Sequence, residues 1–172
     1  MFIITIQYEN VSHIIDKQYA AEQAFLQEFA AGNYTLQNPL VKLNPYSYCP
    51  LTAVLLFRTP VATEITVTVL GKEEAGNIRH TFPAAKEHIL PIYGLYAGYD
   101  NKVVVVAATG QKQVVTSQTE PAIADAHQAT SIKTTAEYMG NNIMFLTTAM
   151  DSMTVGYDYK GDIRWYAKVN IN

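Results

Sequence analysis

The stretch that decides the fold is residues 51–70, which read LTAVLLFRTPVATEITVTVL. Its second half alternates isoleucine or valine with threonine, and this period of two indicates a half-buried β-strand. In its first half, Leu51, Ala53, Leu55 and Phe57 alternate with Thr52, Val54, Leu56 and Arg58, which indicates another strand. Thr59-Pro60 stands between the two halves, and a proline inside a strand pattern usually ends it. We therefore predict two strands here.

Further strands follow at short intervals, separated by turn signals. The strongest is residues 101–109, and residues 113–117 return as its hairpin partner. Residues 88–92 indicate a shorter strand, whereas the polar stretch 72–87 before it is predicted as a loop. The chain holds 17 Thr, 14 Val, 14 Ile and 12 Tyr residues, types that suit pleated, half-buried surfaces. The predicted fold is mainly β, with an immunoglobulin-like β-sandwich at residues 46–118.

Residues 1–45 are predicted as an N-terminal extension that carries one helix. Phe2–Gln7 indicates a short strand before it. The helix is expected to run from Ser12, a suitable N-cap, to Ala31, with Gly32-Asn33 as its stop. Four apolar residues are expected to form its buried face: Ile15, Tyr19, Leu26 and Phe29. This helix either packs on its own protein or docks on a partner.

Residues 34–50 are predicted as a linker along the surface, because their prolines favour extended conformation in the residues before them. Cys49 lies in this stretch and is the single cysteine of the chain. It excludes an internal disulfide and a thiol-rich metal cluster. We expect Cys49 to be a small buried hydrophobic residue.

Charge and length exclude several classes of protein. The 172 residues suffice for a domain with its own core, and a hydrophobic content of 49% excludes a disordered tail. The net charge is −3 and no basic stripe is present, so we expect no nucleic-acid partner. No apolar run approaches the roughly 18 residues of a membrane span. The first residues lack the basic and apolar regions of a signal peptide.

Residues 119–172 are predicted as a connector followed by strands. The polar, alanine-rich residues 120–135 form the connector, and strands are expected at 142–148 and 153–158. Residues 157–166 indicate a hairpin that turns at Lys160-Gly161. A strand pair needs neighbours to be stable, yet the chain ends six residues after this hairpin. We therefore expect the sequence to be a fragment of a longer protein.

Local motifs predict no catalytic residue, no cofactor-binding residue and no metal ligand. No serine lies in a GxSxG elbow, and neither of the glycine-rich phosphate-binding motifs occurs. The histidines show no metal-binding spacing and are expected to be ordinary surface or hydrogen-bonded residues: His13, His80, His88 and His127.

Two groups of acidic residues are candidates for a catalytic pair and for a calcium site, and we expect neither group to form such a site. Glu73 and Glu74 are adjacent in a polar loop, so they are predicted to be solvated rather than a catalytic pair. Asp151, Asp158 and Asp162 lack the register of an EF-hand calcium loop.

Tyr93, Tyr96 and Tyr99 form a tyrosine-rich bend bracketed by Gly94 and Gly98. One interpretation is an exposed platform on which a sugar or a phenol stacks. The other, which we favour, is a bend between strands whose hydroxyl groups bind the backbone.

Four segments together carry a family resemblance. They are Asn44–Tyr46 with Pro50–Ala53, Ile65–Lys72, Pro91–Tyr96 followed by Asn101–Val103, and Gly161–Tyr166. Each alone occurs in many β domains. In this order and spacing, from about Asn44 to the end, they resemble the N-terminal region of the bacterial aryl-sulfate sulfotransferases that do not use the nucleotide sulfate donor (the PAPS-independent family).

The resemblance implies a β-sandwich that precedes a six-bladed β-propeller, which is missing from this chain, with the C-terminal strands leading into it. In that family, a histidine of the propeller takes a sulfuryl group from a phenolic sulfate ester and passes it to a phenol. The residues that do so lie downstream of the matched region, so this chain alone is expected to be inactive.

The resemblance also implies the partners and the location of this domain. The partners are its own C-terminal propeller, which it supports, and a second copy in a homodimer. The family location is extracytoplasmic (periplasmic, secreted or cell-surface), and no cofactor is implied.

Two other functions stay open on the sequence. One is a stand-alone immunoglobulin-like module for carbohydrate binding or adhesion, which would use the tyrosine-rich bend. The other is a small metal-dependent hydrolase, which requires His80 and His88 to meet Glu73 or Glu74.

Overall fold

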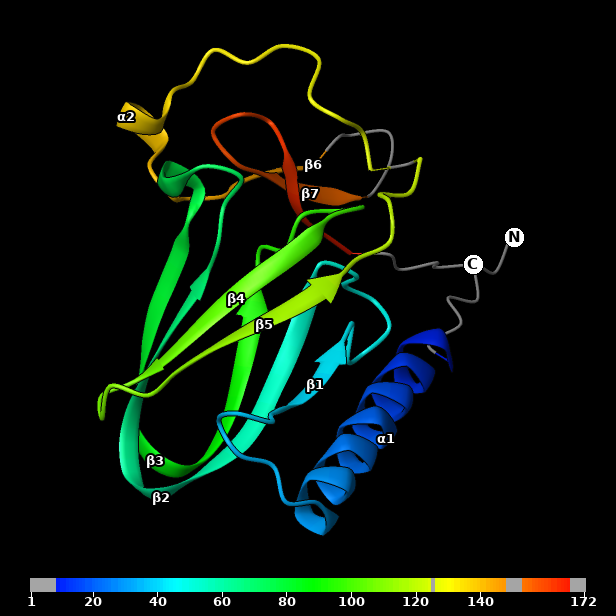
Figure 1. Cartoon of the computed structure of the whole chain (residues 1–172). Coiled ribbons are helices and arrows are strands. Elements are labelled where there is room, and N and C mark those ends of the chain that lie inside the picture. The colour runs from blue at the N-terminus through cyan, green and yellow to red at the C-terminus, as the bar shows by residue number, and fades with distance from the viewer. Residues whose placement is uncertain (1–8, 125, 148–152, 168–172) are drawn as a thin grey trace.

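A long bent hairpin forms the frame of the structure, a computed structural model that describes residues 9–124, 126–147 and 153–167 (Figure 1). Its strands are β2 (Thr52–Val69) and β3 (Ile78–Tyr93), which pair antiparallel. The other elements, in chain order, are α1 (Glu9–Ala31), β1 (Leu40–Leu43), the 3₁₀ turn η1 (Glu74–Gly76), β4 (Asp100–Ala107), β5 (Lys112–Gln118), α2 (Ala136–Met139), β6 (Met144–Thr147), β7 (Thr154–Tyr157) and β8 (Ile163–Tyr166).

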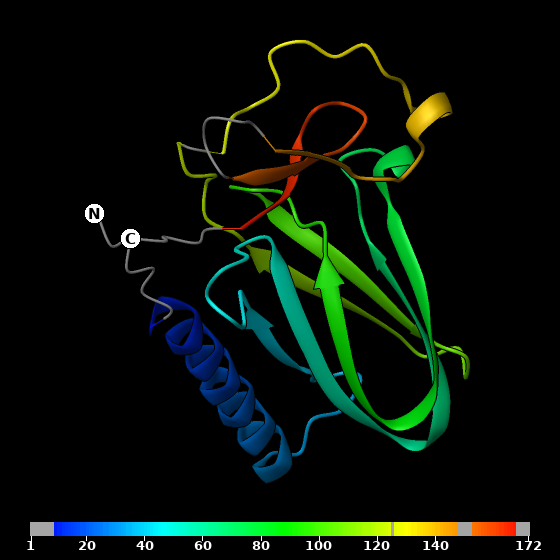
Figure 2. The same ribbon diagram turned by 180° about the vertical axis from the view of Figure 1, so that it is seen from behind.

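One curled sheet contains β1 to β5. Its order is β1-β2-β4-β5, with β3 on the other side of β2. β1 pairs with the first half of β2, and β4 pairs with the second half. Because β2 bends between these halves, the two parts of the sheet face each other (Figures 1 and 2). The described chain is mainly β, as predicted, and the curled sheet is consistent with an immunoglobulin-like sandwich.

β2 is continuous where the sequence predicts two separate strands, so that part of the prediction is wrong. Its pairing with β3 shifts register twice between Arg58 and Ile65. Thr59-Pro60 therefore bends the strand instead of ending it. The lost proline donor is tolerated because β3 follows the same bend, and a bulge leaves residues unpaired in any case.

The predicted loop at residues 72–87 is also wrong from Ile78 onward, because these residues begin β3. In the described chain β3 pairs with β2 alone, so it is the edge strand of both halves of the curled sheet. Most side chains of residues 79–87 are exposed. An edge strand in solvent needs no apolar alternation, and its sequence therefore resembles that of a loop.

β1 lies inside the segment 34–50 that the sequence predicts as a surface linker, which is a further correction. Leu36 and Leu40 in this segment are only 2% and 7% exposed. Pro39 and Pro45 lie on either side of β1, so neither removes a backbone donor from the four residues that pair with β2.

The core lies between the two halves of the curled sheet. Its largest side chains from the first half of the hairpin are Leu55, Phe57 and Ile92, and Ile65 and Val105 face them from the second half. All five are at most 1% exposed. The alternation of threonine with isoleucine and valine is therefore correctly assigned, since the apolar positions point inward.

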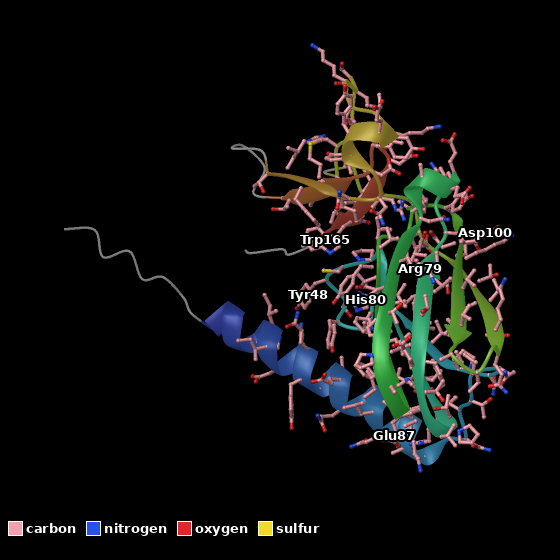
Figure 3. All side chains as sticks on the ribbon, turned by 90° about the vertical axis from the view of Figure 1, so that its left-hand side faces the viewer. Tyr48, Arg79, His80, Glu87, Asp100 and Trp165 are labelled. Atoms are coloured by element: carbon pink, nitrogen blue, oxygen red, sulfur yellow. The ribbon has the colours of Figure 1, made fainter. Side chains whose placement is uncertain are left out.

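Helix α1 covers the outer face of β1 and of the first half of β2. Phe25 and Phe29 pack there against Leu40, Val54 and Leu56. The last turns carry these contacts, and the helix diverges from the sheet toward its N-terminal end (Figures 1 and 3).

Two details of the predicted helix are wrong. Ile15 and Tyr19 are 58% and 63% exposed, because the first half of the helix extends beyond the sheet. The helix begins at Glu9, so Ser12 is not its N-cap. It ends at Ala31 as predicted, but neither Gly32 nor Asn33 has a positive φ. The predicted strand Phe2–Gln7 lies outside the described residues.

Arg58 closes the C-terminal end of α1. Its Nη1 donates hydrogen bonds to the carbonyl oxygens of Phe29 and Gly32, both at 3.2 Å. Its guanidinium carbon lies 4.1 Å from the centre of the Phe29 ring, and its Nε donates to Glu87 at 2.8 Å. A cation at this end of a helix satisfies carbonyl groups that have no partner within the helix.

The C-terminal strands form a second sheet at one end of the curled sheet (Figure 1). Its order is β6-β7-β8, and all pairs are antiparallel. The predicted strands and the hairpin turn at Lys160-Gly161 are confirmed, and Gly161 has a φ of +76°. The short helix α2 lies between the predicted connector and β6, and the sequence does not predict it. Among the described residues, no helix is both long enough and apolar enough to cross a membrane.

His88 is buried at the bend of the hairpin. Its ring stacks on Phe57 with a centroid distance of 4.8 Å, and its Nε2 forms a hydrogen bond of 3.0 Å with Thr59 Oγ1. Burial lowers the pKa of His88. The bend therefore contains an imidazole that the fold holds in its neutral form.

We predict that His88 makes the stability of the domain depend on pH. An unfolded histidine takes up a proton near pH 6.5, and buried His88 does so only at lower pH. The unfolded state therefore binds more protons below about pH 6.5, and the free energy of unfolding should fall there, by at most about 1.4 kcal/mol per pH unit. His88→Gln should remove this part of the slope in urea unfolding between pH 7 and pH 5.

His13→Gln is the matched control, because His13 is exposed on α1. It should keep the slope of the unmodified chain. Equal slopes for His88→Gln and the unmodified chain would contradict the prediction.

Candidate functional site

The structure does not bring together the residues that the hydrolase hypothesis requires. His88 lies inside the bend, whereas the His80 ring packs edge-on against Phe82 at 4.6 Å. In Figure 3, His80 and Glu87, the neighbour of His88, lie far apart along β3. In the part of the chain that the structure describes, no three His, Cys, Asp or Glu side chains gather as a metal site would need.

The remaining histidines and Cys49 lie apart from one another. The side chains of His13 and His127 are exposed, and the carbonyl oxygen of His127 accepts a hydrogen bond from the Tyr157 hydroxyl at 2.5 Å. Cys49 is half-buried before β2, and burial raises the pKa of its thiol.

The tyrosine-rich bend is not an exposed platform. Tyr96 is 2% exposed, whereas Tyr93 and Tyr99 are 56% and 38% exposed. Tyr96 packs edge-on against Tyr99 at 5.5 Å and accepts a hydrogen bond from the backbone N–H of Lys72 at 3.2 Å. The favoured interpretation, a bend whose hydroxyl group binds the backbone, describes Tyr96 correctly.

A buried cluster joins the curled sheet to the C-terminal sheet, and we call Arg164, Asp158 and Tyr96 the junction cluster. Arg164 of β8 is 1% exposed. Its Nε donates to the carbonyl oxygen of Gly94 at 2.6 Å, and its Nη1 donates to that of Gly76 at 3.0 Å. Nη1 also donates to the Tyr96 hydroxyl at 2.8 Å. One side chain of the second sheet thus binds two separate turns of the first.

Gly94 is required for this approach. Its φ is +80°, a conformation that a side chain disfavours, and a Cβ there would lie 2.3 Å from the Ile78 side chain. The same Cβ would lie 3.6 Å from Arg164 Nη2. The glycine therefore lets its carbonyl turn toward the guanidinium group without a clash.

Asp158 completes the cluster through both carboxylate oxygens. Oδ2 accepts a hydrogen bond from the Tyr96 hydroxyl at 2.9 Å and lies 3.6 Å from Arg164 Nη1. Oδ1 accepts from the backbone N–H groups of Lys160 and Asp162 at 2.9 and 3.0 Å. Asp158 therefore shapes the β7–β8 turn and also balances the charge of Arg164.

Burial dominates the electrostatics of this cluster. It raises the pKa of Tyr96 to about 12, with the cation of Arg164 acting in the opposite direction. It lowers the pKa of Arg164, and the neighbouring Tyr96 and Asp158 oppose that effect. Tyr96 therefore remains a neutral donor at physiological pH, as its bond to the carboxylate requires.

A ring of more exposed contacts surrounds the junction cluster. Lys72 pairs with Asp162 at 2.9 Å, and Lys160 pairs with Glu73. Glu73 also accepts a hydrogen bond from the Tyr159 hydroxyl at 2.7 Å. The hydrogen bonds from Lys160 and Tyr159 lower the pKa of Glu73. Glu73 is exposed, as predicted, and it also binds the C-terminal turn.

The arrangement is suited to holding two sheets in place. Its hydrogen-bonding groups are directed at one another, and Nη2 of Arg164 is buried without a hydrogen-bond partner among the residues that the structure describes. A buried ion pair with an unused donor contributes more to a defined geometry than to net stability. The third acidic candidate, Asp151, lies outside the described residues.

The far edge of the C-terminal sheet is apolar and exposed. Met144, Phe145 and Leu146 of β6 are 45%, 55% and 49% exposed. The Phe145 ring packs edge-on against Trp165 at 5.5 Å, over the space that Gly156 leaves open. Three consecutive apolar residues exposed on an edge strand are typical of a surface that another part of a protein covers.

Sequence reasoning identified the segment Gly161–Tyr166 by its resemblance but assigned no role to Arg164. The sequence does contain a sign that Arg164 is buried. It stands between apolar residues in a short strand, and such a position is often buried. Its partners could not be found this way, since they lie about 70 and 88 residues away along the chain.

Comparison with known proteins supports the resemblance. Residues 40–124 match the family described as the arylsulfotransferase Ig-like domain. Over 70 residues the chain is 37% identical to the arylsulfate sulfotransferase AssT of Escherichia coli O6:H1. That match covers 38% of this chain and 12% of the relative, so the chain corresponds to a small part of that protein.

We predict that Arg164→Met lowers the free energy of unfolding by roughly 3–5 kcal/mol, because it leaves Asp158 buried without its cation. Chemical denaturation would measure the loss. Limited proteolysis should also show earlier cleavage within residues 126–167, because the C-terminal sheet loses its bond to the first sheet.

Arg79→Met provides the matched control, since Arg79 is exposed on β3 (Figure 3). Its effect should stay within about 0.5 kcal/mol. A loss below about 1 kcal/mol for Arg164→Met would show that the junction cluster does not hold the sheets together.

Proposed function

Because residues 40–124 form the Ig-like N-terminal domain of the arylsulfotransferase family, we propose that this chain is the non-catalytic N-terminal part of an aryl-sulfate sulfotransferase. The parent enzyme moves a sulfuryl group from a phenolic sulfate ester to a histidine and then to a phenol. That histidine belongs to a six-bladed propeller downstream, and residues 119–172 are the connector and the first strands of that propeller domain.

The observation that carries this role is the exposed apolar edge of the C-terminal sheet. The junction cluster fixes β8 to the curled sheet, and β6 presents its apolar side chains outward. A following domain that continues this sheet would cover β6 and would inherit its orientation from the first domain. The chain would therefore act as a rigid support for the propeller.

The histidines of this chain support a catalytic site elsewhere. Sulfuryl transfer needs donors and cations that converge on developing negative charge. His88 is enclosed by Phe57 and Thr59, and His80 lies against Phe82 on an edge strand. No cationic group of the described residues is directed at the same point as either ring, and we therefore assign the transfer to residues beyond this chain.

Two further parts of the proposal rest on the family alone. We propose an extracytoplasmic location, and we propose that the parent enzyme forms a homodimer. The low content of charged residues, 16%, and the many Thr and Tyr residues are compatible with a protein outside the cytoplasm.

The first test is to read the coding DNA beyond the codon for Asn172. We expect the reading frame to continue into repeated β-strand segments that carry histidines and arginines. A stop codon at that point would remove the catalytic domain, and the chain would then be a stand-alone binding module.

The second test is an assay with 4-nitrophenyl sulfate as donor and phenol as acceptor. The 172-residue chain should show no turnover at a concentration where the full-length protein is active. His80→Gln in the full-length protein should leave kcat/KM within about twofold, because His80 lies outside the proposed site. Turnover by the 172-residue chain, or a large loss in His80→Gln, would reject the assignment.

A further inference from the structure

A groove lies between α1 and the outer face of β3, on the opposite side of the sheet from the core. Its volume is about 260 Å³. Glu22 and Phe25 line it from the helix, Tyr46 from the loop before β2, and Pro91 and Tyr93 from β3. The junction cluster does not extend to this groove, and the proposed sulfotransferase role does not use it.

Glu22 alone among the described lining residues carries a charge. One carboxylate oxygen, Oε1, accepts a hydrogen bond from the Tyr46 hydroxyl at 3.2 Å. No described lysine, arginine or histidine pairs with Glu22. Glu28 on the same helix differs, because Lys42 pairs with it at 2.6 Å. The groove thus contains a half-buried carboxylate that has no cationic partner among the described residues.

Aromatic rings form two walls of the groove. The Tyr46 ring packs edge-on against Phe25 at 6.0 Å, and Tyr93 is 56% exposed. Burial, Glu22 and Tyr93 all raise the pKa of Tyr46, so its hydroxyl remains a neutral donor to Glu22. The faces of aromatic rings carry partial negative charge, so rings and carboxylate together attract a cation.

The loop that carries Tyr46 is held rigidly. The Asn44 side chain accepts a hydrogen bond from the Cys49 N–H at 3.0 Å, and the Ser47 N–H donates to the Asn44 carbonyl at 2.9 Å. The Thr52 hydroxyl donates to the Cys49 carbonyl at 2.8 Å. A preorganised wall loses little freedom when a ligand enters, which favours binding.

We propose that this groove binds a lysine side chain of a partner polypeptide, with Glu22 facing the ammonium group and Tyr46 and Tyr93 beside it. The apolar side chains of Val54 and Ile89 also line the groove and suit the hydrocarbon stem of lysine. Tyr46 donates to Oε1 of Glu22, which leaves Oε2 available to an ammonium group.

The test is an NMR titration of the ¹⁵N-labelled chain with Nα-acetyl-lysine N-methylamide. We expect saturable shifts of the Tyr46, Cys49 and Tyr93 amide signals. The norleucine analogue keeps the stem but lacks the charge, and it should bind more weakly. Glu22→Gln should weaken lysine binding about fivefold, the size expected for one partly exposed ion pair.

Two variants make this result specific to the groove. Glu28→Gln, on the same helix, should bind as the unmodified chain does, because Lys42 already engages Glu28. Tyr93→Ala removes one exposed wall without touching the core, and it should also weaken binding. Equal binding of the norleucine analogue, or unchanged binding in Glu22→Gln, would overturn the proposal.

Discussion

The bend in the β2–β3 hairpin is the constraint on which the rest of the structure depends. A straight hairpin would place its tip and its open end at opposite ends of the molecule. Because this one folds in half, the tip at Gly76 and the open end at Gly94 lie side by side, where Arg164 binds both carbonyl groups. The same bend lets the two halves bury one shared core. Phe57, Thr59 and His88 fix the place where the strand turns.

The junction between the two sheets follows from that geometry. Arg164 can be buried only if both turns present their carbonyl groups, so the second sheet docks correctly only on a correctly bent hairpin. Burying a guanidinium group has a large desolvation cost. The burial of Arg164 therefore adds little net stability, and its main effect is to fix the relative orientation of the two sheets. The outer ion pairs of Lys72 and Lys160 add orientation at a more exposed position. The proposed role of supporting another domain would need this defined geometry more than extra stability.

The sequence predicts those parts of the fold in which apolar pattern and burial coincide. The strands at β4 and β5 and the C-terminal hairpin are of this kind, because a period of two or a glycine turn marks each of them. The first part of β3 could not be found this way, since an edge strand in solvent carries polar residues such as Arg79 and Glu87. The buried face of α1 is predicted wrongly in its N-terminal half for the opposite reason. Ile15 and Tyr19 are apolar, yet no sheet lies beneath them and they are exposed. The junction cluster depends on contacts between distant segments, which no local pattern contains.

The edge position of β3 has a consequence for how molecules of this domain behave toward one another. A strand with one free edge of this length can pair with a strand of a second molecule, which is the first step of aggregation. Here Pro83 and Pro91 interrupt the row of backbone donors, and Lys86 and Glu87 place charge along it. The strand that frames the fold thus carries its own protection against intermolecular sheet growth. In the proposed role, these features would keep two copies of the domain from pairing through β3 while the rest of the parent protein folds.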